Sequence, residues 1–179
     1  MDATAAVRRI RQALVATAPL LSSLVLVLLG SMPLYAGHIG VVMPQLGVAA
    51  VFYWTIYRPD LMTYSAAFAV GLVADIVSGA PLGSTALAVL IVRRIVLAQR
   101  RYLIGKPFQV LWVGFLLAAL AAAVVSWCTA SIYLFRLVDV GPLLVRTMMA
   151  MVMFPAVAWL LARCQVMLPM PRAITLQRN

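Results

Sequence analysis

The residue with the clearest potential for chemistry is Asp75, which lies in the apolar stretch GLVADIVSGAPLG at residues 71–83. The chain contains four acidic residues, and all of them are aspartates. The other three lie at the edges of apolar segments: Asp2, Asp60 and Asp139. An acid inside a membrane segment is costly unless it is paired, hydrogen-bonded or protonated, and such acids often mark proton or ion paths. We therefore expect Asp75 to be protonated or to have an ion-pair or hydrogen-bond partner, whether its role is in transport or in the fold.

The sequence offers two hypotheses for the partner of Asp75. Arg146 is expected a short distance inside the outer end of the sixth helix, at a depth similar to that of Asp75. A buried Asp75–Arg146 ion pair is therefore one hypothesis, and loss of either partner would then destabilise the protein. The alternative is a protonated Asp75 that is hydrogen-bonded to Ser84, to Thr85 or to amides of the turn at residues 79–83. A proton relay would need further acids along its path. Because the other aspartates lie at the membrane edges, we favour a structural role.

The remaining residues do not form a recognisable catalytic or metal-binding set. The sequence lacks a Ser/His/Asp arrangement, a phosphate-binding loop and zinc-ligand spacing, and its one histidine, His38, is expected in an outer loop. Cys128 and Cys164 fall in different apolar segments near opposite membrane faces, which argues against a disulfide or a shared metal. We therefore predict a protein that is not an enzyme, with no cofactor and no metal.

The composition predicts that the chain lies in a membrane. Hydrophobic residues make up 65% of it and charged residues 10%, whereas a soluble domain is roughly 45–50% apolar. The net charge of +10 does not indicate nucleic-acid binding, because the basic residues lie at the ends of apolar segments. We expect one integral membrane domain over residues 1–179, with a basic arm at 1–12, a bundle at 13–162 and a tail at 163–179.

Apolar length and turn residues predict an all-α fold, a bundle of six membrane-spanning helices with short connections. The expected spans are residues 13–35, 39–57, 61–78, 84–97, 108–135 and 141–162. The first is too long for the apolar region of a signal peptide, so we expect an uncleaved helix. The fourth is short before Arg93 and Arg94, which leaves five and six spans both open. Prolines within the expected spans, at positions 19, 44 and 155, are expected to kink them.

The basic residues orient these spans. If the N-terminus is cytoplasmic, the inner segments are 1–12, 58–60, 93–107 and 163–179. These hold Arg8, Arg9, Arg11, Arg58, Arg93, Arg94, Arg100, Arg101, Lys106, Arg163, Arg172 and Arg178, twelve of the 14 basic residues, and leave Arg136 and Arg146. By the positive-inside rule, both termini are therefore expected in the cytoplasm.

Small residues surround Asp75 at helical spacing. Ala67, Gly71, Asp75 and Gly79 are four residues apart, so they form one stripe on a helix. Small residues at this spacing let helix backbones approach closely within lipid. We expect the stripe to face another helix rather than the bilayer.

The ordered set of residues around this stripe resembles the rod shape-determining protein MreD family. The residues that carry the resemblance are Phe52-Tyr53-Trp54, Arg58-Pro59, Ala67-Phe68, Gly71-Leu72, Asp75, Gly79, Pro81-Leu82-Gly83, Ala86 and Gln99-Arg100-Arg101. Its most specific part is the pattern GL-x-x-D-x-x-x-G-x-P-L-G, and the match runs from the first expected span to the fifth.

This resemblance implies a non-enzymatic scaffold subunit of the elongation machinery in the bacterial inner membrane. MreD-like proteins work with MreC, whose single membrane helix leads to a periplasmic domain, and with MreB filaments, the RodA glycosyltransferase and its penicillin-binding transpeptidase. Their fold is similar to that of the substrate-binding components of energy-coupling-factor vitamin transporters. A second copy of the chain and the lipid bilayer are further expected partners.

The resemblance also implies roles for the motif residues. It assigns domain shaping and helix docking to Gly71, Leu72, Asp75, Pro81, Leu82 and Gly83. The residue pattern adds Ala67, Gly79 and Arg146 to this set.

A small-molecule carrier, like the vitamin-binding transporter components, is the alternative function. It predicts a ligand-sized cavity that opens outward. The polar side chains that could hold a ligand are few: Asp75, Ser78, Ser84, Thr85, Ser126, Thr129 and Ser131. Their small number favours the scaffold.

Overall fold

The computed structural model describes residues 17–32, 34–35, 41–42 and 44–166, which form six helices and one short strand pair. The helices are an N-terminal helix (Thr17–Gly30), α2 (Leu46–Tyr57), α3 (Tyr64–Ser78), α4 (Ser84–Leu103), α5 (Phe108–Leu134) and α6 (Gly141–Val166). The strands β1 (Leu34–Tyr35) and β2 (Val41–Val42) pair antiparallel.

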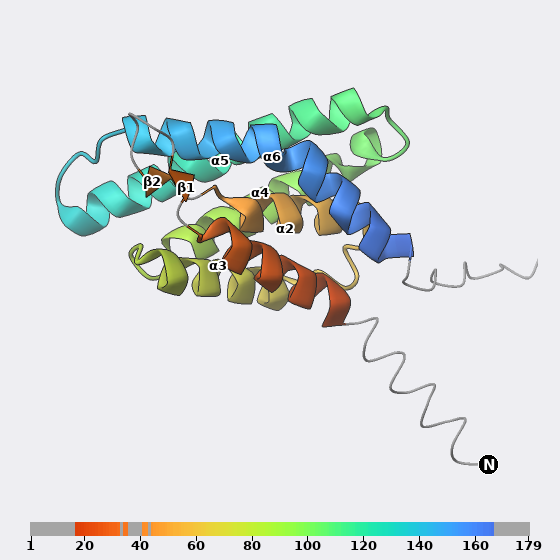
Figure 1. Ribbon diagram of the computed structural model, residues 1–179, viewed down its shortest axis with the longest axis horizontal. Coiled ribbons are helices and arrows are strands. Elements are labelled where there is room, and N and C mark those ends of the chain that lie inside the picture. The colour runs from red at the N-terminus through yellow and green to blue at the C-terminus, as the bar shows by residue number, and fades with distance from the viewer. Residues whose placement is uncertain (1–16, 33, 36–40, 43, 167–179) are drawn as a thin grey trace, which may run out of the picture.

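Successive helices run in opposite directions, so the described chain begins and finishes at the same end of the bundle (Figure 1). We call this the proximal end, and it also holds the α2–α3 and α4–α5 turns. The distal end holds the α3–α4 and α5–α6 turns. These two ends are the reference frame for the sites described below.

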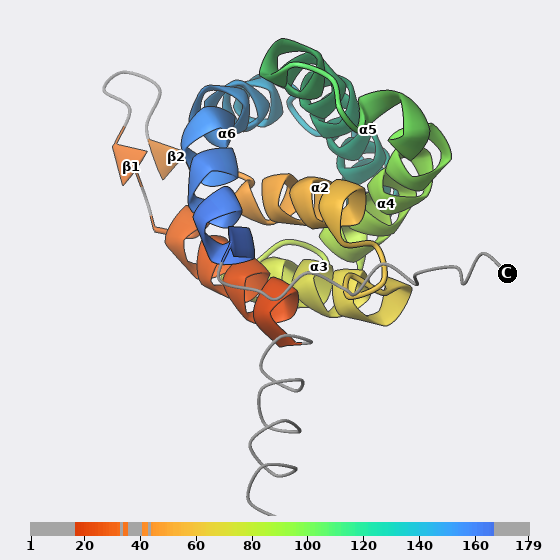
Figure 2. The same cartoon turned by 90° about the vertical axis from the view of Figure 1, so that its right-hand side faces the viewer.

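The α2 helix lies at the centre of the bundle, and the other helices surround it (Figure 2). All of its residues from Leu46 to Ile56 are buried. In the core, Phe115 of α5 stacks on Phe154 of α6 with ring centroids 4.2 Å apart, and Phe52 of α2 meets both rings edge-on. A helix that is apolar on every side is stable only when protein or lipid covers it, and here protein covers it.

The turn before α3 and the turn after it follow from local sequence. The hydroxyl of Thr63 accepts a hydrogen bond from the amide of Ala66 at 3.2 Å, which caps the start of α3. At its other end Gly79 adopts a left-handed conformation with φ +66°, and Gly83 does so with φ +95° just before α4. Glycine adopts positive φ without steric cost, so the two glycines permit a tight connection.

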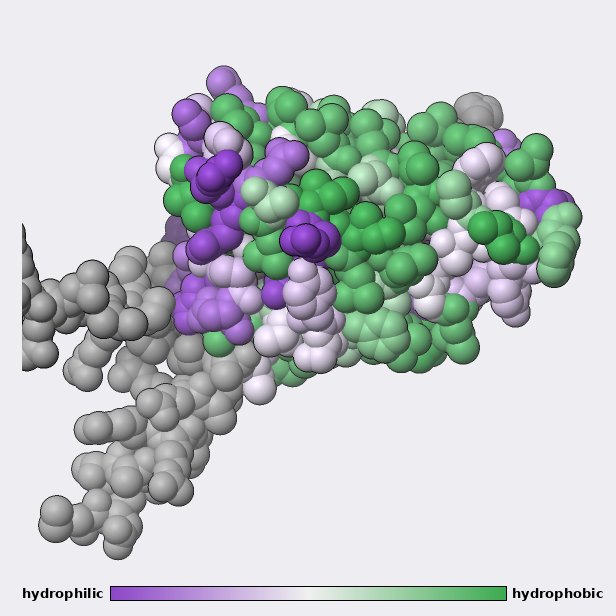
Figure 3. Space-filling model, turned by 180° about the vertical axis from the view of Figure 1, so that it is seen from behind, coloured by the Kyte–Doolittle hydropathy of each residue, from purple (hydrophilic) through white to green (hydrophobic). Residues whose placement is uncertain are grey.

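The helices differ in how they relate to a bilayer. The α5 and α6 helices are long and apolar enough to cross one, whereas the N-terminal helix, α2 and α3 are apolar but shorter. At 1.5 Å per residue, α5 is about 40 Å long and α2 about 18 Å, against a hydrocarbon thickness of about 30 Å. Hydrophobic side chains cover the middle of the outer surface, and hydrophilic ones gather toward the proximal end (Figure 3).

The predicted all-helical architecture is confirmed, but several predicted boundaries are wrong. The fourth helix does not end near residue 97; it continues to Leu103 and has 20 residues, so Arg93 and Arg94 lie within it. The second helix begins at Leu46 rather than near residue 39, since Val41–Val42 is a strand and Pro44 precedes the helix instead of kinking it. The N-terminal helix ends at Gly30, not Tyr35, which lies in β1.

The remaining predicted segments are only partly visible. Residues 163–166 belong to α6 rather than to a tail. The basic arm at 1–12, His38 and residues 167–179 lie outside the described residues. Both cysteines, Cys128 and Cys164, are free thiols.

Candidate functional site

Asp75 joins the end of α3 to the start of α4 through its carboxylate. The side chain is fully buried and accepts hydrogen bonds from the amides of Gly83 and Thr85, both at 2.8 Å. The Ser84 hydroxyl donates a third at 3.1 Å, and the amide of Ala86 a longer one at 3.4 Å. The first amides of a helix have no partner within the helix, and a carboxylate placed there also meets the positive end of the helix dipole. Asp75 therefore caps α4.

The main chain of Asp75 caps the other helix. Its carbonyl accepts hydrogen bonds from the amides of Gly79 and Ala80, which end α3. One residue thus satisfies groups at both ends of the α3–α4 turn. We refer to this arrangement as the Asp75 clamp.

The stripe of small residues faces α4, as predicted. Ala67 and Gly71 are buried, and a methyl group added at Gly71 would stand 2.4 Å from the Cα of Ala86. This distance is too short for any side chain, so only glycine permits the close approach of the two backbones. Gly79 ends the stripe as the cap of α3.

Of the two hypotheses for Asp75, the hydrogen bonds match the partners of the second, namely Ser84, Thr85 and turn amides. All of them donate to the side-chain oxygens, which suits a carboxylate rather than the protonated acid of that hypothesis. All four donors come from the turn and from α4. Arg146 lies nearby, because it lines a cavity together with Ser84 and Thr85. Its guanidinium is not among the four donors.

A cavity of about 310 Å³ lies at the distal end, between the α3–α4 turn and the facing ends of α5 and α6. Its polar side chains come from three helices and from the segments before α2 and between α5 and α6: Gln45, Ser84, Thr85, Ser126, Asp139 and Arg146. Its volume lies at the lower limit of small-molecule sites. A second cavity of about 40 Å³ also contains Gln45, Thr85 and Arg146 in its lining, so Arg146 borders both.

Some of the polar side chains that the sequence offered as possible ligand contacts line this cavity, and others do not. Ser84, Thr85 and Ser126 line it, and Pro81 of the motif does so as well. Thr129 instead donates to the carbonyl of Val125 within α5. Leu82 is 71% exposed on the turn itself, so among the motif residues it is the one best placed to contact another molecule.

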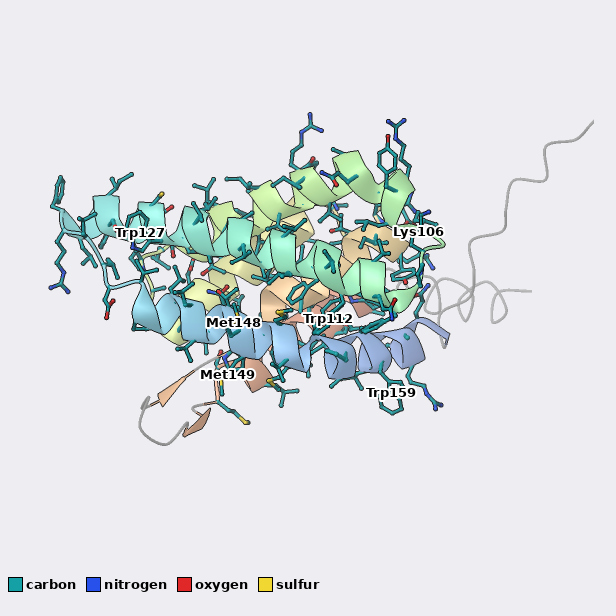
Figure 4. The ribbon with its side chains drawn as sticks, turned by 90° about the horizontal axis from the view of Figure 1, so that it is seen from above. Lys106, Trp112, Trp127, Met148, Met149 and Trp159 are labelled. Carbon is teal, nitrogen blue, oxygen red and sulfur yellow. The ribbon has the colours of Figure 1, made fainter. Side chains whose placement is uncertain are left out.

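A second polar contact, between α5 and α6, is not evident from the sequence. Pro155 lies inside α6 and has no amide hydrogen, so the carbonyl of Met151, four residues earlier, loses its helical donor. The indole N–H of Trp112 in α5 donates to this carbonyl at 3.1 Å. Figure 4 shows Trp112 where the two helices lie side by side. The proline was visible in the sequence, but no pattern there identifies its donor.

Replacing Trp112 with phenylalanine should destabilise the protein by about 1–2 kcal/mol, because the partly buried carbonyl of Met151 would lose its donor. In a Pro155→Ala background the loss should be smaller, since the alanine amide can donate to Met151 instead. Thermal unfolding of the four proteins in detergent tests this as a double-mutant cycle. Equal losses in both backgrounds would contradict the assignment.

Trp127→Phe is the matched control for this cycle. Its indole donates to the carbonyl of Val138 in the α5–α6 connection, at 2.9 Å. This carbonyl lies in a loop rather than in a helix broken by proline. The stability lost on Trp127→Phe should therefore be the same whether residue 155 is proline or alanine.

Comparison with known proteins gives one match. The sequence model of the family described as rod shape-determining protein MreD matches residues 8–164. No curated protein and no solved structure matches the chain.

Proposed function

Because the chain belongs to the family of the rod shape-determining protein MreD, we propose that it is a scaffold subunit of the elongation complex. This is a family of shape-determining membrane proteins and not a known enzyme family. In this proposal it lies in the bacterial inner membrane, binds MreC and supports lateral peptidoglycan synthesis. RodA, its penicillin-binding transpeptidase and MreB are further proposed members of the same assembly, and a second copy of the chain is another.

We propose six membrane passages with both termini in the cytoplasm. The full length of α4, about 30 Å for its 20 residues, supports an even number of passages. The short α2 helix then crosses at the centre of the bundle, and the short α3 helix crosses among the helices that surround it. In this orientation the proximal end is cytoplasmic and the distal end is periplasmic, as the basic residues at the proximal end also favour.

The observation that carries the scaffold proposal is the apolar tip of the α5–α6 hairpin. This tip reaches past the α3–α4 turn at the distal end (Figure 1). Its exposed residues are Ile132, 73% exposed, Tyr133, 66%, Phe135, 96%, and Leu137, 81%. The α5 helix, about 40 Å long, exceeds a hydrocarbon layer of about 30 Å, so in the proposed orientation we place part of this surface beyond the lipid tails. Exposed apolar surface of this kind is typical of protein interaction sites.

We therefore propose that the part of MreC next to its membrane helix docks on this tip. The double variant Phe135→Ser, Leu137→Ser should lower the recovery of MreC with the tagged full-length chain by at least roughly tenfold, as loss of one binding hot spot does. The measurement is purification from native membranes in mild detergent followed by mass spectrometry.

Tyr102→Ser is the control for this experiment, since Tyr102 is 60% exposed but lies at the proximal end. It should leave MreC recovery unchanged. Equal recovery with all three proteins would exclude the tip as the docking surface. Absence of MreC from the wild-type preparation would count against the scaffold itself.

The distal cavity favours a second candidate function, the carrier of a small molecule. A volume of about 310 Å³ with Arg146 and several hydroxyl groups in its lining suits a small polar ligand. Mass spectrometry of small molecules in the same preparation discriminates between the two functions. A metabolite that is retained by the wild type and lost from Arg146→Gln would favour the carrier.

A further inference from the structure

Three arginines converge on the α2–α3 turn at the proximal end. Arg100 of α4 donates from Nε to the carbonyl of Ile56 at 2.7 Å. Arg93 lies two helical turns earlier on the same face and donates from Nη2 to the carbonyl of Pro59 at 3.4 Å. In the turn itself, Nε of Arg58 is 3.6 Å from Oδ1 of Asp60. We call these three residues the arginine cluster.

The hydrogen bonds of this cluster are incomplete. Arg93 is 5% exposed and Arg58 is 8% exposed. Among the described side chains, the buried polar atoms without a hydrogen-bond partner are Nε and Nη1 of Arg93, Nε of Arg58 and Oγ1 of Thr55. Thr55 and Arg58 are one turn apart on α2, and Arg93 contacts the residue after Arg58, so all four atoms belong to one region. A buried guanidinium stays charged, and each N–H without an acceptor is unfavourable.

The cluster also lacks negative charge. Asp60 is its acidic neighbour, and 57% of that side chain is exposed to solvent. Of the other acids in the described part of the chain, Asp75 and Asp139 lie at the distal end. Three arginines and one aspartate leave an excess of two positive charges. The carbonyls at the end of α2 offset only part of it.

We propose that the arginine cluster binds the phosphate of an anionic phospholipid in the adjacent leaflet. A phosphate offers several acceptor oxygens, and guanidinium groups bind them in a fixed, forked geometry. The surroundings fit the headgroup region, because Tyr57, Tyr64 and Tyr102 are all partly exposed at this end and such rings concentrate at the membrane interface. Hydrophilic surface borders hydrophobic surface here (Figure 3). Basic sites between helices on this side of a membrane are suited to acidic lipids.

Tyr64 controls access to the cluster. Its ring lies over the Arg93 guanidinium, 4.6 Å from the charged carbon to the ring centroid, and the side chain is 47% exposed. Rotation of this side chain opens Arg93 to the interface and exchanges one cation–π contact for the phosphate. Arg58 and Arg100 provide the rest of the site.

The test uses the purified full-length chain in detergent and four proteins: wild type, Arg93→Gln, Arg100→Gln and Arg94→Gln. Arg94 is the matched control, because it neighbours Arg93 on α4 but is exposed. Native mass spectrometry measures retention of added phosphatidylglycerol, with phosphatidylcholine as the neutral comparison, and thermal unfolding measures stabilisation by each lipid.

Wild type and Arg94→Gln should retain phosphatidylglycerol and be stabilised by it. Arg93→Gln and Arg100→Gln should each bind it about fivefold more weakly. Equal binding by all four proteins would overturn the proposal, and so would equal stabilisation by phosphatidylcholine. Stabilisation by inorganic phosphate alone, as strong as that by the lipid, would identify a site for a free oxyanion and overturn the lipid assignment. If Arg93→Gln does not fold, the partly exposed Arg100 decides the outcome.

Discussion

Replacing Asp75 with alanine should prevent the protein from reaching a stable fold. The substitution removes the fully buried acceptor of two amide hydrogen bonds of 2.8 Å and of one hydrogen bond from a hydroxyl. Hydrogen bonds to a charged group contribute about 1.5–3 kcal/mol each, so the two short ones alone account for about 3–6 kcal/mol. A typical domain has only about 5–15 kcal/mol of stability. Thermal unfolding in detergent and abundance in membranes are the measurements.

The conservative variant Asp75→Asn should lose about half as much stability. Asparagine keeps one acceptor oxygen, but its amide group would meet the N–H of either Gly83 or Thr85, and two donors cannot bond to each other. Asp139→Asn is the control, because Asp139 is exposed and accepts one hydrogen bond, from the amide of Gly141. If Asp75→Asn and Asp139→Asn are equally mild, the clamp contributes little to the fold.

The second large effect is expected at Gly71. An added methyl group would stand 2.4 Å from the Cα of Ala86 and 2.8 Å from its nitrogen, and neither backbone atom can move without moving α4. Overpacking of this kind costs about 1–3 kcal/mol for alanine, and valine at Gly71 should cost more. Separation of the helices would also draw the amides of Thr85 and Ala86 away from Asp75. The losses from Gly71→Ala and Asp75→Asn should therefore be less than additive when combined.

Gly114→Ala provides the comparison for Gly71. Gly114 also lies inside a helix, but the atom nearest to an added methyl group is the Cδ2 of Leu103, at 3.0 Å, at the end of a flexible side chain. Leu103 can shift, so this variant should unfold within a few degrees of the wild type. A loss at Gly114 equal to that at Gly71 would show that close backbone approach is not the reason for glycine at position 71.

The sequence predicted the helical class, the stripe on α3 and, in one of the two hypotheses for Asp75, its hydrogen bonds with Ser84, Thr85 and turn amides. The partners of Asp75 could be predicted because a buried acid in an apolar helix needs polar groups close to it, and the sequence has few such groups nearby. The boundary errors have two physical causes. The charges of Arg93 and Arg94 predict the end of a helix, yet the carbonyl of Pro59 and the ring of Tyr64 hold Arg93 within it. The start of α2 was misplaced because an apolar run looks the same in a strand and in a helix.

The contacts that sequence reasoning could not find join residues far apart in the chain. Trp112 and Met151 are 39 positions apart, and Arg100 and Ile56 are 44 apart. The distal cavity likewise depends on the spacing between α4, α5 and α6. No local pattern encodes such distances, so these features require the folded structure.

The central position of α2 has a consequence for how the protein is made. The α2 helix precedes α4, α5 and α6 in the chain, and residues of these later helices cover it. With 12 residues it is too short to rest in the bilayer as an independent span. Its cover is therefore complete only after α6, the last of the described helices, has been made and has packed against it. A chain that ends before α6 therefore lacks part of the protein surface that covers α2.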